Sequence, residues 1–303
     1  MREPEQPLVS VVVPVLNAEA DLPACLNALT RQSQPPFEII VVDNGSTDRS
    51  REVAAQFPVR LVEEARPGAA SARNRGVEAA RGEIIAFTDA DCAAARTWLA
   101  ALTAEFRAPE VTVVAGRMVP FPQQDSPIVT YSALIGQYSA EASLQHPRFP
   151  YAPTACMALR KTVLNEVGGF DPDFLTYEGP DLFYRLHRIG LMRARYAPRA
   201  MLFYRTRATF RAFVRQNYRY GQGYGRFCHK HAADLEPALR SLPAHLGRWR
   251  SRTAVGCRKL IESGPRNLRS QLITLHVARE TAQLAGTLRW RALGPHGSGN
   301  PMR

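Results

Sequence analysis

The chain has 303 residues, of which 45% are hydrophobic and 22% charged, so it can bury a large core. Met1 to Pro7 lacks the apolar core of a secretory leader, and no apolar run reaches the roughly 18 residues that a membrane-spanning helix needs. The five scattered cysteines form no C-x-x-C pair, which argues against a disulfide framework or a zinc ribbon and predicts a reducing, cytoplasmic location.

The positive charge is concentrated in the C-terminal third. Residues 1–205 hold 21 Lys and Arg against 23 Asp and Glu, whereas residues 206–303 hold 18 against 4. The whole net charge of +12 therefore comes from the second part, which by itself carries +14. We predict a first domain over 1–205 and a basic helical region over 206–303, ending in a disordered tail and facing an anionic partner or surface.

Strand-like and helix-like segments alternate through the first half. β-branched apolar runs predict strands, and apolar residues spaced by three and four predict helices. The predicted strands are 9–15, 37–43, 59–63, 84–88 and 111–119. The predicted helices are 21–31, 46–57, 69–80 and 97–107. This alternation predicts an α/β fold with a Rossmann-like, doubly wound, mainly parallel sheet.

The second half is less regular. It predicts helices over 127–143, 162–167 and 181–189, followed by a strand over 193–204. Beyond that strand the pattern is helical, and it predicts a basic helical extension. One helix is expected over 209–220 and another over 268–293, with a break between them at Gly221, Gly223 and Gly225.

Three polar clusters follow predicted strands, where open α/β sheets bind their ligands. They are Asn17 with Glu19, the run from Asp43 to Asp48, and the pair Asp89 and Asp91. Two carboxylates one residue apart repel each other unless a cation lies beside them. Mg²⁺ or Mn²⁺ suits this place, because such an ion binds protein carboxylate oxygens and phosphate oxygens at the same time. The pair therefore favours a metal–diphosphate site, and a helix cap or a solvated turn is the alternative.

Four segments, in this order, resemble family 2 glycosyltransferases with the GT-A fold: SVVVPVLNAEADLPACLNAL, FEIIVVDNGSTDRS, RPGAASARNRGVEAARGEIIAFTDADC and VGGFDPDFLTYEGPDLFYRLHRIG. The resemblance covers about residues 8–205. It implies a metal-dependent, inverting hexosyltransferase that uses a nucleotide-sugar, typically a UDP-sugar. The acceptor would be a saccharide or a lipid-linked molecule, as in the biosynthesis of cell-envelope polysaccharides.

The resemblance also implies the residues of a donor site. Those that would bind the nucleotide and its diphosphate are Pro14, Asn17, Glu19, Asp43, Arg66, Arg73 and Asp89. Asp91, together with Asp89, would hold Mn²⁺ or Mg²⁺. Two alternatives stay open at this point, because Asp43 also suits an N-terminal helix cap and Arg73 also suits a solvated helix surface.

The segment that would supply the base for the acceptor departs from the family pattern. The family usually supplies it from a Glu-Asp-x-Asp-Leu run, but this chain reads Glu178-Gly179-Pro180-Asp181-Leu182, with Gly179 where the customary aspartate stands. Glu178 and Asp181 remain as candidates, with Glu178 ahead. Asp181 could instead cap a helix and pair with Arg185 four residues later. Gly179 also keeps open a donor-binding but inactive homologue.

Two other positions depart from the family pattern. Cys156 stands where many members have asparagine, so the contact that this asparagine would make to the acceptor or the donor sugar is not expected here. Arg205 stands where many members have a metal-binding histidine, and it could contact phosphate directly.

The basic region permits two kinds of partner. Arg211, Arg215 and Arg219 recur every four residues on one predicted helix, which favours docking on an anionic membrane, such as the inner face of the plasma membrane. A core-packing helix with solvated arginines is the alternative. Nucleic-acid binding is a further reading of the charge, but no recognition module is present in the sequence.

Overall fold

The structure is a computed structural model that describes residues 8–122, 124–137, 139–146, 149–235 and 241–293. The chain divides into two compact units, Met1–Phe121 with Tyr138–Arg205, and Pro122–Gln137 with Thr206–Arg303. Residues 122–137 thus group with the helical unit, although the sequence predicts one domain over 1–205. The functional boundary between a catalytic domain and a basic region stays a prediction, and the predicted disordered tail lies outside the described residues.

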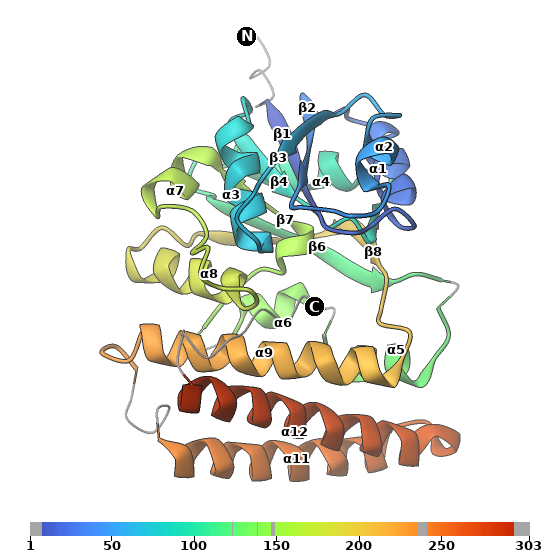
Figure 1. Cartoon of the computed structure of the whole chain (residues 1–303), viewed down its shortest axis with the longest axis vertical. Helices are drawn as coiled ribbons and strands as arrows, with labels where there is room; N and C mark the ends of the chain where they lie inside the picture. Colours follow the sequence, from blue (N-terminus) through green and yellow to red (C-terminus); the bar gives the residue numbers. More distant parts are fainter. Residues whose placement is uncertain (1–7, 123, 138, 147–148, 236–240, 294–303) are drawn as a thin grey trace. The chain divides into compact units, whose positions relative to one another are not determined.

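The first unit is built on an eight-stranded sheet in the order β3-β2-β1-β4-β7-β6-β8-β5 (Figure 1). The strands are β1 Val9–Val15, β2 Glu38–Asp43, β3 Arg60–Glu63, β4 Ile84–Phe87, β5 Cys92–Ala94, β6 Val113–Pro120, β7 Met157–Arg160 and β8 Ala194–Tyr204. The first four are mutually parallel, and β6 and β8 are parallel to each other. Strand β7 runs antiparallel between β4 and β6, and β5 is antiparallel to β8. The predicted mainly parallel α/β sheet is confirmed.

The helices of this unit cover both faces of the sheet. They are α1 Leu22–Thr30, α2 Ser50–Ala54, α3 Ala69–Ala79, α4 Trp98–Ala104, α6 Ala140–Leu144, α7 Lys161–Glu166 and α8 Glu178–Arg188, with the short 3₁₀ turns Glu105–Arg107 and Thr154–Cys156. The helix predicted over 127–143 is wrong as one element. It is α5 and α6, separated around Gly136, whose φ of 72° is a left-handed conformation that ends α5.

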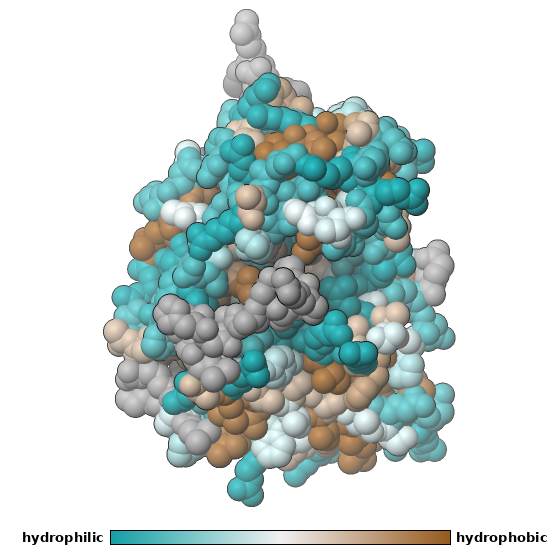
Figure 2. Space-filling model, in the orientation of Figure 1, coloured by the Kyte–Doolittle hydropathy of each residue, from teal (hydrophilic) through white to brown (hydrophobic). Residues whose placement is uncertain are grey.

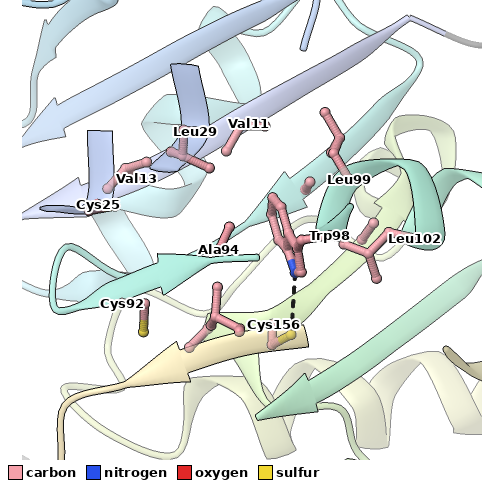
Figure 3. Close-up of a cluster of buried hydrophobic side chains, with 14 of the residues drawn as sticks. Val11, Val13, Cys25, Leu29, Cys92, Ala94, Trp98, Leu99, Leu102 and Cys156 are labelled. Carbon is pink, nitrogen blue, oxygen red and sulfur yellow. Dashed lines mark hydrogen bonds between the residues drawn. The ribbon is translucent and has the colours of Figure 1, made fainter. Parts of the chain in front are cut away.

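Strand β1 divides the core into two layers because its side chains alternate between the faces. Val11 and Val13 pack on one side with Leu29 of α1 and Trp98 of α4, whereas Val12 belongs to the opposite cluster. Figure 3 shows the first cluster, in which the Trp98 indole Nε1 donates to Cys156 Sγ at 3.4 Å. Cys156 is fully buried, so in the structure it is a core residue.

The second unit is helical, with α5 Pro127–Leu134, α9 Phe210–Lys230, α11 Leu242–Ser263 and α12 Arg269–Leu293, and a 3₁₀ turn at Arg266–Leu268. Within this unit α12 lies between α9 and α11 (Figure 1). Its apolar core includes Tyr131, Phe213, Leu260 and Leu272. Within the described residues, no helix is both long and apolar enough to cross a bilayer.

The predicted break at Gly221, Gly223 and Gly225 is wrong, because α9 continues through all three glycines to Lys230. The reason is a close contact with α12. A Cβ at Gly221 would overlap the Gln283 carbonyl oxygen, and a Cβ at Gly286 would overlap the Tyr218 carbonyl oxygen. These glycines let two helix backbones touch, so they promote packing where the sequence pattern indicates a turn.

Candidate active site

The three polar clusters come together at one edge of the sheet. Strands β2, β1 and β4 are neighbours, and Val15 at the end of β1 pairs with Asp43 at the end of β2. Asp89 and Asp91 lie in the short segment between β4 and β5. Because the carboxyl ends of parallel strands share one edge, the topology places the predicted donor residues beside each other.

The first two clusters are joined by hydrogen bonds between the loops that follow β1 and β2. The Asn17 backbone N–H donates to Ser46 Oγ at 3.0 Å, and the Thr47 N–H donates to Asn17 Oδ1 at 2.8 Å. Glu19 Oε2 accepts the N–H of Arg49 at 3.0 Å. Asn17 has a φ of 52°, a left-handed conformation that asparagine tolerates. Asn17 and Glu19 therefore hold these loops in place.

Pro14 and Asp43 lie within the last two residues of β1 and β2, at the same edge of the sheet. Pro14 is within β1, opposite Val42 of β2. The Asp43 side chain is buried, and its Oδ1 accepts the N–H of Ser46 at 3.2 Å while its Oδ2 lies 3.4 Å from Arg51 Nε. Asp43 thus caps the turn at Ser46, and an ion pair fixes its orientation. The alternative of an N-terminal helix cap is wrong, because α2 begins at Ser50 and Arg49 is its N-cap residue.

A residue outside the predicted set, Asn44, shapes the segment before α3. Its Nδ2 donates to the carbonyl oxygens of Glu64 and Arg66, and its Oδ1 accepts the N–H of Gly68 at 2.7 Å. Arg66 is half exposed and its Nη2 lies 2.6 Å from Asp173 Oδ1. The only sequence signal for Asn44 is its place directly after Asp43. The hydrogen bonds of Asn44 therefore fix the backbone of the segment that contains Arg66.

Arg73 is the centre of the site. Its side chain is only 3% exposed; its Nη1 donates to Glu178 Oε1 at 2.7 Å and its Nη2 donates to Asp89 Oδ1 at 2.8 Å. The guanidinium also lies over the Phe170 ring, 5.7 Å from its centroid. Burial disfavours the charged form, but the carboxylates of Asp89 and Glu178 outweigh it and raise the pKa of Arg73. The alternative of a solvated helix residue is therefore wrong.

Two buried polar atoms at this centre lack a hydrogen-bond partner among the described residues. They are Arg73 Nε and Thr88 Oγ1, the latter directly before Asp89. A buried donor without a partner costs free energy, so such atoms call for an explanation. Arg73 contacts both Asp89 and Glu178, and Thr88 precedes Asp89 in the chain, so a polar ligand or water beside these two atoms would be stabilised.

The acidic pair has distinct surroundings. The Asp89 side chain is 30% exposed. Asp91 accepts the Arg205 N–H at its backbone oxygen at 3.2 Å, and Cys92 Sγ lies 3.6 Å from Asp91 Oδ1. The side chain of Arg205 is held by Asp21, with 2.6 Å between Nε and Oδ1. Arg205 thus supports the Asp91 backbone.

The charge of the acidic pair affects two buried thiols. Cys25 and Cys92 are almost fully buried, and burial raises the pKa of each thiol. The negative charges of Asp91 and Asp89 raise both pKa values further. Both sulfurs are therefore held as neutral thiols, and the carboxylates have no thiolate competing with them for a cation.

The fit of a divalent ion can be judged from its donor set. Among the described residues, no group of three or more His, Cys, Asp or Glu side chains is arranged to hold a metal. The acidic pair instead offers carboxylate oxygens on one short segment. This suits a hard ion that takes one or two protein carboxylates and completes its shell with phosphate oxygens and water. The residues therefore fit Mg²⁺ or Mn²⁺ bound together with a diphosphate.

Glu178 and Asp181 differ sharply in access. Glu178 begins α8 after Tyr177, whose φ of 74° is left-handed, and its side chain is 13% exposed. Asp181 is fully buried, with Oδ2 2.8 Å from Arg185 Nε. Arg185 also donates to the carbonyl oxygens of Val167 and Gly169. Asp181 therefore joins α8 to the turn after α7, whereas Glu178 shares Arg73 with Asp89.

The glycine at position 179 has a packing explanation. A Cβ at Gly179 would lie 2.7 Å from Cγ2 of Thr154, a distance that real Cβ atoms essentially never show. Thr154 belongs to the 3₁₀ turn before β7. The methyl group of Thr154 occupies the space that an aspartate at 179 would need, so the packing here requires the glycine.

Comparison with known proteins gives a consistent picture. The sequence profile described as Glycosyl transferase family 2 matches residues 10–168. The pre-mycofactocin glycosyltransferase of Mycobacterium tuberculosis is 31% identical over 242 residues, which cover 77% of this chain and 50% of that protein. The chain spans about half the length of the curated relatives it matches.

Solved structures match over most of the chain. A mannosyltransferase from Pyrobaculum calidifontis, in complex with GDP-Man and Mn²⁺, aligns with a TM-score of 0.67 at 22% identity, covering 94% of this chain and 87% of that one. Glucosyl-3-phosphoglycerate synthase of Mycobacterium tuberculosis, in complex with Mn²⁺, UDP and phosphoglyceric acid, aligns with a TM-score of 0.53 at 19% identity, covering 74% and 78%. At these identities the likeness concerns the fold, and it confirms the predicted GT-A architecture.

Proposed function

The chain belongs to glycosyl transferase family 2, and from that premise we propose that it transfers a hexose, with inversion, from a nucleotide-sugar to a saccharide or lipid-linked acceptor. The observation that supports the proposal is that a single buried guanidinium, that of Arg73, binds both Asp89 and Glu178. In the proposal Asp89 belongs to the donor side and Glu178 to the acceptor side. A donor diphosphate and an acceptor base would thus be placed on one rigid frame.

The donor would lie along the carboxyl ends of β1, β2 and β4. In this proposal Asp43, Asn17, Glu19 and Pro14 shape the pocket for the base and the ribose, and Asp89 faces the ribose. Arg66 would contact the diphosphate, since its guanidinium is half exposed and its ion pair with Asp173 lies at the surface. We propose a UDP-sugar as donor, and a GDP-sugar is the nearest alternative because solved relatives bind both nucleotides.

Asp91, with Asp89, would hold Mn²⁺ or Mg²⁺, and the bound ion would neutralise charge on the departing nucleoside diphosphate. Asp89 can serve only in part, because one of its oxygens accepts a hydrogen bond from Arg73. Asp91 is therefore the principal protein ligand in this proposal. The backbone N–H of Arg205 supports Asp91, and its guanidinium pairs with Asp21. We therefore propose no contact between Arg205 and the phosphates.

Glu178 would act as the general base. Its carboxylate would take the proton of the acceptor hydroxyl as the acceptor oxygen bonds to the anomeric carbon and the bond from that carbon to the diphosphate breaks. Arg73 is a positioning residue, because it fixes Glu178 Oε1 and leaves the other oxygen for the acceptor. Asp181, although a second candidate from the sequence, would act structurally through Arg185, since its carboxylate is fully buried.

A second candidate function is a donor-binding protein without transfer activity. The observation that favours it is the packing of Thr154 against Gly179, where the family usually supplies its base. In that case nucleotide-sugar would bind at the acidic pair without turnover. The two candidates differ in what Glu178 does, so one variant separates them.

The test is a screen of UDP-, GDP- and dTDP-sugars with and without Mn²⁺, which records both binding and donor hydrolysis. Glu178→Gln keeps the size and the hydrogen bond to Arg73 but removes the base. Transfer predicts intact donor binding and a loss of turnover of about a hundredfold or more. Binding without turnover in the unmodified chain would favour the second candidate. Equal turnover in the variant would contradict the role of Glu178.

A further inference from the structure

The outer face of α11 has no partner among the described residues. Helix α11 packs against α12, with α12 lying between it and α9 (Figure 1). Its inward residues include His245 and Leu260, which are buried. The exposed residues that recur every three or four positions on the opposite face are Pro243, Leu246, Arg250, Ala254, Arg258 and Ile261. This sequence of positions forms one stripe along the helix.

Large apolar side chains on and beside this stripe are open to solvent. Val255 is 65% exposed, Ile261 is 51% exposed and Leu246 is 40% exposed. Figure 2 shows hydrophobic patches among hydrophilic ones over the region of α11 and α12. Single exposed apolar residues are ordinary, but here Ile261 lies on the stripe while Leu246 and Val255, nine residues and about half a turn of rotation apart, lie at its two edges. The stripe with its arginines is thus flanked by exposed apolar side chains on both sides.

The same face is strongly basic. Within α11 there are five Lys and Arg residues against a single acidic one, Glu262. Arg250, Arg258 and Lys259 are exposed, and none of them forms an ion pair with any described residue. Arg252 shows the contrast, because it turns inward to the buried carboxylate of Glu280, with 3.0 Å between Nε and Oε2. The outward cations are thus available to an external anion.

We propose that the outer face of α11, defined by Leu246, Arg250, Val255, Arg258 and Ile261, docks on a bilayer surface that carries anionic headgroups. A helix with exposed Leu, Val and Ile can insert these side chains at the boundary of headgroups and acyl chains. Arginine stems lie along that boundary while the guanidinium groups reach the headgroup phosphates. Each cation near an anionic surface adds attraction, and this attraction weakens as salt is added.

Charge and apolarity together favour this occupant over two others. Nucleic-acid backbones attract the cations but leave exposed Val255 and Ile261 without a partner. A second copy of the chain would cover the apolar side chains but would bring two sets of arginines together. Only a membrane surface satisfies both features of the face. The proposal does not depend on sugar transfer, so it can fail or hold independently of it.

The experiment measures sedimentation of the full chain with phosphatidylcholine vesicles, with and without phosphatidylglycerol, at about 0.15 M salt. Val255→Ser/Ile261→Ser removes the apolar contribution without changing charge, and Val277→Ser on α12, which is 38% exposed, is its control. Arg250→Glu/Arg258→Glu reverses two charges on the face. Arg211→Glu/Arg215→Glu makes the same charge change on α9, where the sequence predicts the membrane contact, and so decides between α9 and α11.

The proposal predicts binding to anionic vesicles only, weakened about tenfold or more by either α11 double variant and little changed by Val277→Ser or by the α9 variant. All variants are at exposed positions, and unchanged melting temperatures would confirm that they fold. Three results would overturn it: no sedimentation of the unmodified chain, equal binding by the serine double variant, or a loss confined to the α9 variant. Retention on single-stranded RNA without vesicle binding would replace it with the nucleic-acid reading.

Discussion

Arg73 and Glu178 are 105 positions apart in the chain, yet their side chains meet at 2.7 Å between Nη1 and Oε1. The second Nη of the same guanidinium meets Asp89 at 2.8 Å. A cation that is 3% exposed between two carboxylates links α3, the turn after β4 and the start of α8. The proposed donor and acceptor groups therefore depend on one buried ion-pair network.

Removing the Arg73 cation should damage both stability and activity. Arg73→Met leaves Asp89 and Glu178 facing each other without a counter-charge, and breaking a buried pair in this way costs about 3–5 kcal/mol. We expect a correspondingly lower free energy of unfolding in urea. Arg75→Met, on the same helix but with an exposed pair to Glu78, should change it by less than about 1 kcal/mol. Equal effects of the two variants would contradict the central place of Arg73.

Restoring the family's aspartate at position 179 should fail by itself. Gly179→Asp brings its Cβ against Thr154 Cγ2, so we expect a loss of about 1–3 kcal/mol in unfolding free energy. Thr154→Ser removes only that methyl group. The double variant should therefore recover much of the loss in a thermal melt. A single variant as stable as the unmodified chain would show that the packing explanation of Gly179 is wrong.

The glycine contact between α9 and α12 should be intolerant of a methyl group. Gly221→Ala places a Cβ against the Gln283 carbonyl oxygen, and separating the helices should cost about 1–3 kcal/mol. Gly247 on α11 is the matched control, because a Cβ there would meet no atom of another element within 4 Å. Gly247→Ala should be neutral or stabilise by about 0.5–1 kcal/mol through helix propensity. Denaturant titrations of the two variants would compare these effects.

The helical unit should lose stability in mild acid through His245. Burial, followed by the charges of Arg248 and Arg291, lowers the pKa of His245 to about 4. The unfolded chain binds a proton near pH 6.5, whereas the folded chain resists it until about pH 4. Stability from this group is therefore complete above about pH 6.5 and is lost as the pH falls toward 4. His245→Gln should flatten the decrease between pH 7 and pH 5 in urea unfolding, and an unchanged slope would contradict it.

Sequence patterns predict the parts of the fold that depend on local chemistry. Strands β1, β2 and β4 are short runs of β-branched residues, and Asp43 and Asp89 at their ends follow from parallel topology. The role of Arg73 could not be predicted, because its partners lie 16 and 105 positions away and only the tertiary fold brings them together. Its burial overturns the solvated alternative that its place on a helix permits.

The errors have physical reasons of the same kind. Glycines at 221, 223 and 225 favour a turn by local propensity, but α9 runs through all three, and Gly221 and Gly225 pack closely against α12. No separate helix is predicted where α11 lies, because several arginines stand among its apolar residues. Strand β5 has only three residues and β7 contains no β-branched residue, so neither shows a clear strand pattern.

The most direct test of the donor-site proposal is calorimetric titration of UDP into the chain with Mn²⁺ and with EDTA, repeated for Asp91→Asn. The proposal predicts that Mn²⁺ tightens UDP binding by about tenfold or more in the unmodified chain, and that Asp91→Asn loses this gain while it keeps its melting temperature. UDP affinity that is the same with and without Mn²⁺, or a full gain in the Asp91→Asn variant, would contradict it.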